Sequence, residues 1–98
     1  MKIRTEPIPV GGEVHWFWCP GCQETMMFQT GRKPAWEWNG DHEKPTVTPS
    51  IRTEYYTGKL CHIFIRDGQI QFLSDCTHEL AGTTVPMDDI SQESNSAA

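Results

Sequence analysis

Four cysteines are the residues whose types and spacing most directly indicate chemistry. Only a proline and a glycine separate Cys19 from Cys22, and this tight turn directs both sulfurs toward one point. The other two cysteines, Cys61 and Cys76, lie far along the chain. Zn²⁺ prefers four soft or borderline ligands in a tetrahedron. If the distant pair folds back onto the first pair, four thiolates would surround one zinc ion.

The segment from residue 60 to residue 75 predicts that the two pairs do meet. Asp67-Gly68 stands between two alternating apolar runs, which is the strongest short-range signal of a two-residue hairpin. In that register Cys61 faces Ser74, so Cys61 and Cys76 become diagonal neighbours on one face. The other face carries His62, Phe64, Leu73 and Asp75. We therefore predict one zinc site with the ligands Cys19, Cys22, Cys61 and Cys76.

Two histidines keep other arrangements open. His62 and His78 each stand close to a cysteine, so either could complete a site of three cysteines and one histidine, or lie beside the ligands. A catalytic zinc keeps one position open, and a small zinc enzyme could use His62, His78 or Asp75 near the metal. A redox-active pair at Cys19 and Cys22 is disfavoured, because a strand and not a helix is expected after it.

Composition limits the function classes. The 98 residues fit a single small domain, whose thin core benefits from a metal staple. The 8 basic and 13 acidic side chains give a net charge of −5 without a basic stripe, which disfavours nucleic-acid binding. We see no export signal and no membrane span, so we expect a reducing cytosol, where cysteines bind metals more often than they form disulfides.

The periodicity predicts a mostly β domain without a long helix. Strands are expected at 13–18, 24–29, 36–38, 51–56, 60–66, 69–75 and 83–87, after an extended arm at 1–12. Residues 42–50 are expected to form a loop, and 77–82 a single helical turn. Polar, small residues after Met87 predict that 1–87 is the folded domain and that 88–98 is a disordered tail.

A second group of residues could form a docking surface. Trp36 and Trp38 would place both indoles on one side of a short strand, next to the turn that contains Asn39 and Asp41. Such a surface could bind a partner or a small ligand. The alternative is that the two indoles fill the thin core, which we favour because a core this small needs large side chains.

Several strings of this chain resemble a family of small proteins encoded by bacteriophages and prophages. They are HWFWCPGC (15–22), WEWNGD (36–41), PTVTPSI (45–51), CHIFIRDGQIQFL (61–73) and DCTHELAG (75–82). Members of that family are often labelled ammonia monooxygenase, but this chain has neither a copper site nor membrane segments to support the label. The resemblance implies zinc binding, a phage origin and a setting in the host bacterial cytoplasm, and it includes His62 and His78 among the family's motif residues.

These observations lead to a functional expectation. The main hypothesis is a phage-encoded, non-enzymatic interaction module that binds a host or phage protein, for example as an inhibitor of a host defence protein. The alternative hypothesis is a small zinc-dependent enzyme that uses His62 and His78 near the metal. A zinc ion with an open coordination position would favour the enzyme.

Overall fold

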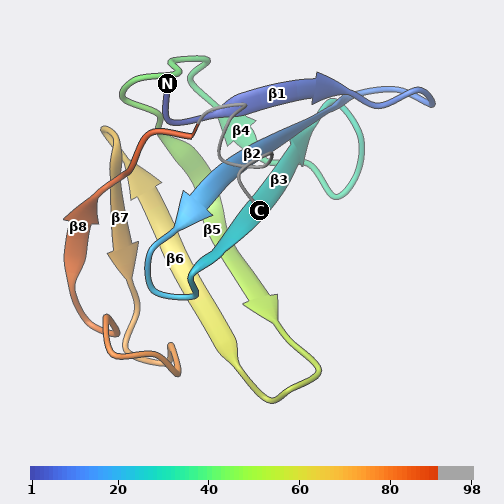
Figure 1. Ribbon diagram of the computed structural model, residues 1–98. Helices are drawn as coiled ribbons and strands as arrows, with labels where there is room; N and C mark the ends of the chain where they lie inside the picture. Colours follow the sequence, from blue (N-terminus) through green and yellow to red (C-terminus); the bar gives the residue numbers. More distant parts are fainter. Residues whose placement is uncertain (91–98) are drawn as a thin grey trace.

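The computed structural model describes residues 1–90, and these form two antiparallel β-sheets (Figure 1). The first sheet has the order β1-β2-β3, and the second has the order β4-β5-β6-β7-β8. The strands are β1 Arg4–Pro7, β2 Glu13–Cys19, β3 Glu24–Thr30, β4 Glu37–Trp38, β5 Val47–Glu54, β6 Leu60–Arg66, β7 Gln69–Phe72 and β8 Thr84–Pro86. The predicted mostly β fold is confirmed, and no helix occurs within residues 1–90.

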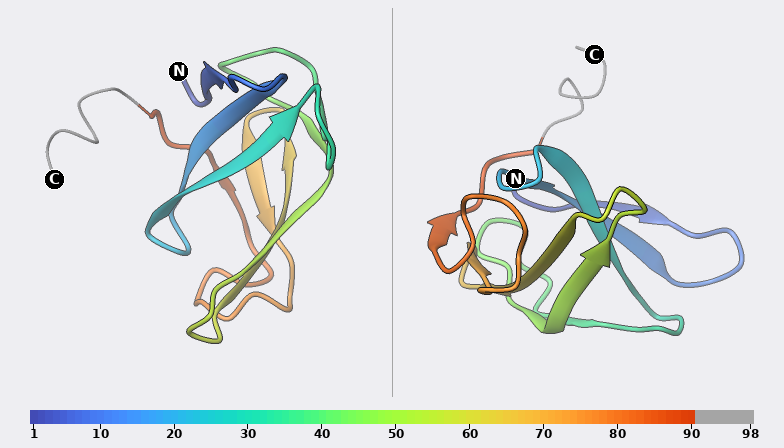
Figure 2. Two further views of the ribbon diagram at one scale, coloured as in Figure 1. Left: turned by 90° about the vertical axis from the view of Figure 1, so that its right-hand side faces the viewer. Right: turned by 90° about the horizontal axis from the view of Figure 1, so that it is seen from below.

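The two sheets enclose one hydrophobic core, and Figure 2 shows β2 and β3 crossing over the larger sheet. Alternate residues of β2 point inward, so Phe17 is fully buried while Trp16 and Trp18 are half-buried on the outside. The larger sheet contributes Ile63 from β6 and Phe72 from β7 to the same core. Each sheet therefore has one buried face, and the outer face of the larger sheet remains accessible.

The hairpin of β6 and β7 forms with the predicted register. Asp67 and Gly68 have φ values of 49° and 75°, which two-residue hairpin turns of the primed type require. Ile63 pairs with Phe72 as expected. However, β7 ends at Phe72, because the chain then turns and the Cys76 N–H donates to the Leu73 carbonyl at 3.2 Å. The predicted continuation of the strand to residue 75 is therefore wrong.

Strand β5 begins earlier than predicted and contains a bulge. Val47 pairs with Ile65 and Ile51 pairs with Ile63, so β5 advances four residues while β6 advances two. The expected loop at 42–50 is thus partly strand, and Ser50 lies within the bulge. Bulges change the direction of side chains and are common next to active sites.

Residues 77–82 form turns where we expected one helical turn. Ala81 N–H donates to the His78 carbonyl at 3.2 Å, and Thr83 N–H donates to the Leu80 carbonyl at 3.0 Å. At the end of the described chain, the buried Ile90 donates its N–H to the Met1 carbonyl at 2.8 Å. Most of the predicted disordered tail, residues 91–98, lies outside the described residues. Among the described residues, no helix is long and apolar enough to cross a membrane.

The tryptophans of the second candidate site pack against the core. The Trp38 ring centroid lies 4.6 Å from that of His15, which is fully buried between the hydroxyls of Thr5 and Thr30 at 2.9 and 2.8 Å. Burial lowers the pKa of His15, so its imidazole stays neutral. The Trp36 indole N–H donates to the backbone carbonyl of Ser50 at 3.2 Å.

Asn39 and Asp41 hold the following turn together. The Asn39 side-chain oxygen accepts the N–H groups of Asp41 and Thr46, each at 3.1 Å. The Asp41 carboxylate accepts those of Glu43 and Lys44 at 2.8 and 3.0 Å, and these bonds lower the pKa of Asp41. These contacts account for the composition of the turn without a ligand, and partner binding at these residues remains a prediction.

Candidate functional site

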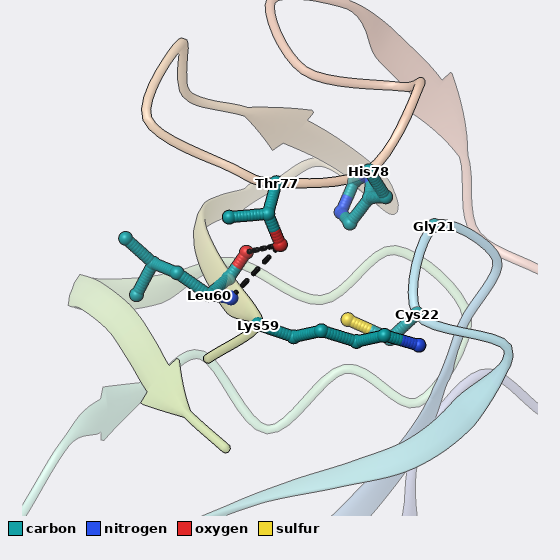
Figure 3. Close-up of a pocket in the computed structure, with 6 residues that line it drawn as sticks. All are labelled: Gly21, Cys22, Lys59, Leu60, Thr77 and His78. Carbon is teal, nitrogen blue, oxygen red and sulfur yellow. Dashed lines mark hydrogen bonds between the residues drawn. The ribbon is translucent and has the colours of Figure 1, made fainter. Parts of the chain in front are cut away.

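Three cysteines and one histidine meet between the two sheets. Cys19 ends β2, Cys22 lies in the turn before β3, Cys61 is the second residue of β6, and His78 comes from the loop after β7. Their ligand atoms all lie within 4.8 Å of one another, close enough to hold a metal ion. Figure 3 shows the Cys22 sulfur and the His78 ring facing each other.

The spacing of these atoms agrees with a tetrahedral site. The Sγ atoms of Cys19 and Cys61 are 3.7 Å apart, and Cys61 Sγ lies 3.5 Å from His78 Nε2. Tetrahedral zinc with ordinary Zn–S and Zn–N bond lengths requires separations of about 3.8 and 3.6 Å. A disulfide would need about 2.05 Å, and all four cysteines are free. The donor set therefore fits a tetrahedral metal ion.

Hydrogen bonds among the thiols favour the thiolate form of Cys19. The bond from the Cys61 thiol lowers the pKa of Cys19 to about 6, although burial opposes this shift. The Cys22 N–H also donates to Cys19 Sγ at 3.3 Å. The same thiol pair raises the pKa of Cys61, and burial raises that of Cys22. Burial lowers the pKa of His78, which favours the neutral imidazole that metals bind.

Cys76, the predicted fourth ligand, is not part of this cluster. Its sulfur lies 3.2 Å from the backbone nitrogen of His62 and 3.3 Å from the carbonyl oxygen of the same residue. The physical reason is the turn after Phe72, which removes Cys76 from the strand face on which we expected it. His78 takes its place, as in the alternative set of three cysteines and one histidine.

Gly21 leaves the space that His78 occupies, because a Cβ atom at Gly21 would overlap the imidazole ring. We expect Gly21→Ala to displace His78 and to weaken metal binding by about 10-fold or more, while Pro20→Ala in the same turn should have little effect. Competition with a chromogenic zinc chelator measures this affinity. Equal zinc affinities of Gly21→Ala and the wild type would contradict the assigned position of His78.

A second group of polar residues lies on the outer face of the larger sheet. Ser50 Oγ is 3.0 Å from His62 Nε2, and His62 Nδ1 is 3.1 Å from an Asp75 carboxylate oxygen. An ionised carboxylate can only accept hydrogen bonds, so the neutral His62 donates from Nδ1 and its Nε2 accepts from the Ser50 hydroxyl. This order of contacts is the arrangement of a serine nucleophile, a general base and an orienting carboxylate.

Each member of this triad comes from a different element. Ser50 projects from the bulge of β5, His62 from the outer side of β6, and Asp75 from the turn after β7. The side chains of His62 and Asp75 are 23% and 48% exposed, and Ser50 is half-buried. All three side chains are therefore partly exposed to solvent.

Comparison with protein families bears on this triad. A model of the family described as "Bacterial ubiquitination-like system serine protease (BubE)" matches residues 4–73, which is well over half of the chain. The chain belongs to the BubE family. No curated protein and no solved structure gives a significant match.

Membership of the BubE family corrects the main functional expectation. A family described as a serine protease is associated with an enzyme, so the hypothesis of a non-enzymatic phage interaction module is wrong, and the alternative of an enzyme fits better. The matched range includes Ser50 and His62 and ends at Leu73, just before Asp75. The position of Asp75 in the triad rests on the geometry. The phage origin remains a prediction.

Sequence reasoning named His62 and Asp75 as candidate catalytic residues, but of a zinc enzyme and without a serine. Hairpin parity placed His62 and Asp75 on the same face, and the structure brings them together. Ser50 was assigned to a loop, and only the bulge in β5 places its hydroxyl against His62. The signal that could have indicated the triad is a serine close to the face that carries His62 and Asp75.

The structure also has a cavity of about 290 Å³ beside the cysteine cluster. Its lining residues are Gly21, Cys22, Lys59, Leu60, Thr77 and His78 (Figure 3). None of the triad residues lines this cavity. The group of three cysteines and His78 is thus separate from the triad, and the two share β6 through the neighbouring residues Cys61 and His62.

Proposed function

We propose that this chain is a serine protease in which Ser50 is the nucleophile, His62 the general base and Asp75 the residue that orients His62. The observation that carries the proposal is the continuous pair of hydrogen bonds from Ser50 Oγ through both nitrogens of His62 to Asp75, at 3.0 and 3.1 Å. The serine protease family match over residues 4–73 supports it independently.

The reaction follows from these contacts. Ser50 Oγ attacks a carbonyl carbon of the substrate, while His62 Nε2 takes the hydroxyl proton. Asp75 stabilises the imidazolium that forms. The bond from the carbonyl carbon to the leaving group then breaks, and His62 returns the proton to that group, which leaves an acyl ester on Ser50. Water hydrolyses the ester, again with His62 as general base, and Ser50 is regenerated.

The substrate class follows from the family description and from exposure. We assign a protein of a bacterial ubiquitination-like system as the substrate, in agreement with the description of the family. The triad lies on an open sheet face, and a protein segment can reach such a face more easily than it can enter a closed pocket. The scissile bond is an amide or ester of this protein.

We assign Zn²⁺ to the cluster of Cys19, Cys22, Cys61 and His78, with a structural role. Four protein ligands fill a tetrahedral site, and closed sites of this kind contribute folding energy. Leu80 N–H now donates to His78 Nδ1 at 3.2 Å, which leaves the imidazole proton on Nε2. A zinc ion bound at Nε2 would require the neutral tautomer with its proton on Nδ1, which can no longer accept the Leu80 N–H, so we expect this contact to change on metal binding. His62 belongs to the triad in this assignment.

Covalent labelling tests the proposal. A fluorophosphonate reacts with activated serine hydroxyls, so we expect one adduct, located on Ser50 by peptide mass spectrometry. The variants Ser50→Ala and His62→Ala should lose the label, and Thr48→Ala, an exposed residue of the same bulge, should keep it. Absence of a label on the folded wild type, or labelling at another residue, would refute the assignment of Ser50.

A further inference from the structure

We propose that Cys76 is a positioning residue of the triad, whose thiol fixes the backbone of His62 and thereby places the imidazole between Ser50 and Asp75. This inference rests on the proposed function. It also gives a role to the cysteine that the metal cluster does not use.

The need for such a residue arises where β7 ends. In an antiparallel pair, His62 and Leu73 would exchange both of their backbone hydrogen bonds. The structure retains one of these, since Leu73 N–H donates to the His62 carbonyl at 2.9 Å. The other is missing, because the Leu73 carbonyl accepts the Cys76 N–H at 3.2 Å instead. The turn that brings Asp75 to His62 thus takes away the strand partner of the His62 N–H.

The Cys76 thiol replaces that partner. Its sulfur accepts the His62 N–H at 3.2 Å, and its S–H donates to the His62 carbonyl at 3.3 Å. Cys76 is only 8% exposed, so water has little access to take over these bonds. A backbone N–H without a partner at such a position is costly, and the thiol supplies both an acceptor and a donor.

The position of Cys76 in the chain connects these bonds to catalysis. Asp75 directly precedes Cys76, and its carboxylate contacts His62 Nδ1 at 3.1 Å. The turn from Leu73 to Cys76 therefore holds His62 at three points, which are its carbonyl, its N–H and its ring nitrogen. Catalysis is sensitive to displacements of about 1 Å, so loosening the backbone of His62 should affect the rate.

The test compares Cys76→Ala, Cys76→Ser and the exposed control Ser74→Ala in the zinc-bound full chain, with p-nitrophenyl acetate as the substrate. For Cys76→Ala we expect kcat to fall by about 10- to 100-fold with little change in KM. Cys76→Ser keeps a donor and an acceptor and should recover part of the loss. Ser74→Ala should match the wild type.

Two further measurements separate positioning from other roles. In the wild type we expect a strongly deshielded Nδ1 proton of His62, because this nitrogen donates to Asp75 at 3.1 Å. This NMR signal should weaken or disappear in Cys76→Ala, while the zinc content stays unchanged. Loss of zinc in Cys76→Ser would instead identify Cys76 as a ligand and overturn the inference. Wild-type kcat and an unchanged Nδ1 signal in Cys76→Ala would also overturn it. An inactive wild type would refute the proposed function, and the Nδ1 signal would still test Cys76.

Discussion

Ser50→Ala is expected to lower kcat by about 10³-fold or more, because removing the nucleophile of such a triad leaves only the contribution of substrate binding. The same loss is expected for His62→Ala, since the hydroxyl of Ser50 then has no base at 3.0 Å. Asp75→Asn should reduce kcat strongly with less effect on KM, because an amide would no longer hold the required tautomer of His62. Hydrolysis of p-nitrophenyl acetate measures all three variants.

The losses of kcat in the triad variants should not add when two variants are combined. Members of a triad act as a unit, so the double variant Ser50→Ala/His62→Ala should be no slower than either single variant. Thr48→Ala is the matched control, since Thr48 lies in the same bulge and is exposed. Each variant should bind as much zinc as the wild type, because none of its changes touches the cluster. Undiminished hydrolysis by Ser50→Ala would rule out the serine mechanism.

Local patterns predicted most of the fold. Asp67-Gly68 fixed the turn and the register of β6 and β7, and the alternation in β2 separated Phe17 from Trp16 and Trp18 correctly. These features depend on neighbours in sequence. The end of β7 does not, because it depends on how the turn after Phe72 packs against β6. The fourth candidate ligand was misplaced for that reason, since His78 and not Cys76 lies together with Cys19, Cys22 and Cys61.

The triad shows the same division between local and tertiary information. Hairpin parity predicted that His62 and Asp75 share a face. The contact does form, but the turn after Phe72 and not continued strand pairing brings Asp75 to His62. Ser50 reaches them only because β5 advances four residues while β6 advances two. In the sequence, Pro49 indicated a loop, since a proline cannot donate to the hydrogen-bond ladder of a sheet. A bulge of this kind is specified by the packing of two strands.

Removal of the metal is expected to unfold the protein. Apparent binding free energies of structural zinc are about 10–16 kcal/mol at neutral pH, and small domains are stable by only about 5–15 kcal/mol. The cluster joins the β2–β3 turn of one sheet to β6 and the loop after β7 of the other. A strong chelator should therefore abolish the cooperative thermal transition, and Cys19→Ser should be unfolded at room temperature.

Removal of zinc should abolish both the fold and the activity, whereas changes in the triad should abolish the activity alone. Chelation should stop ester hydrolysis through loss of the fold, and added Zn²⁺ should restore the fold and the hydrolysis. Ser50→Ala should keep the melting temperature of the wild type.

Elemental mass spectrometry should find one zinc per chain, and X-ray absorption should find three sulfurs and one nitrogen around it. Retention of the wild-type melting temperature after complete chelation would show that the domain folds without the metal. Because Cys61 and His62 are adjacent in β6, such a result would also mean that the strand holds His62 in place without zinc.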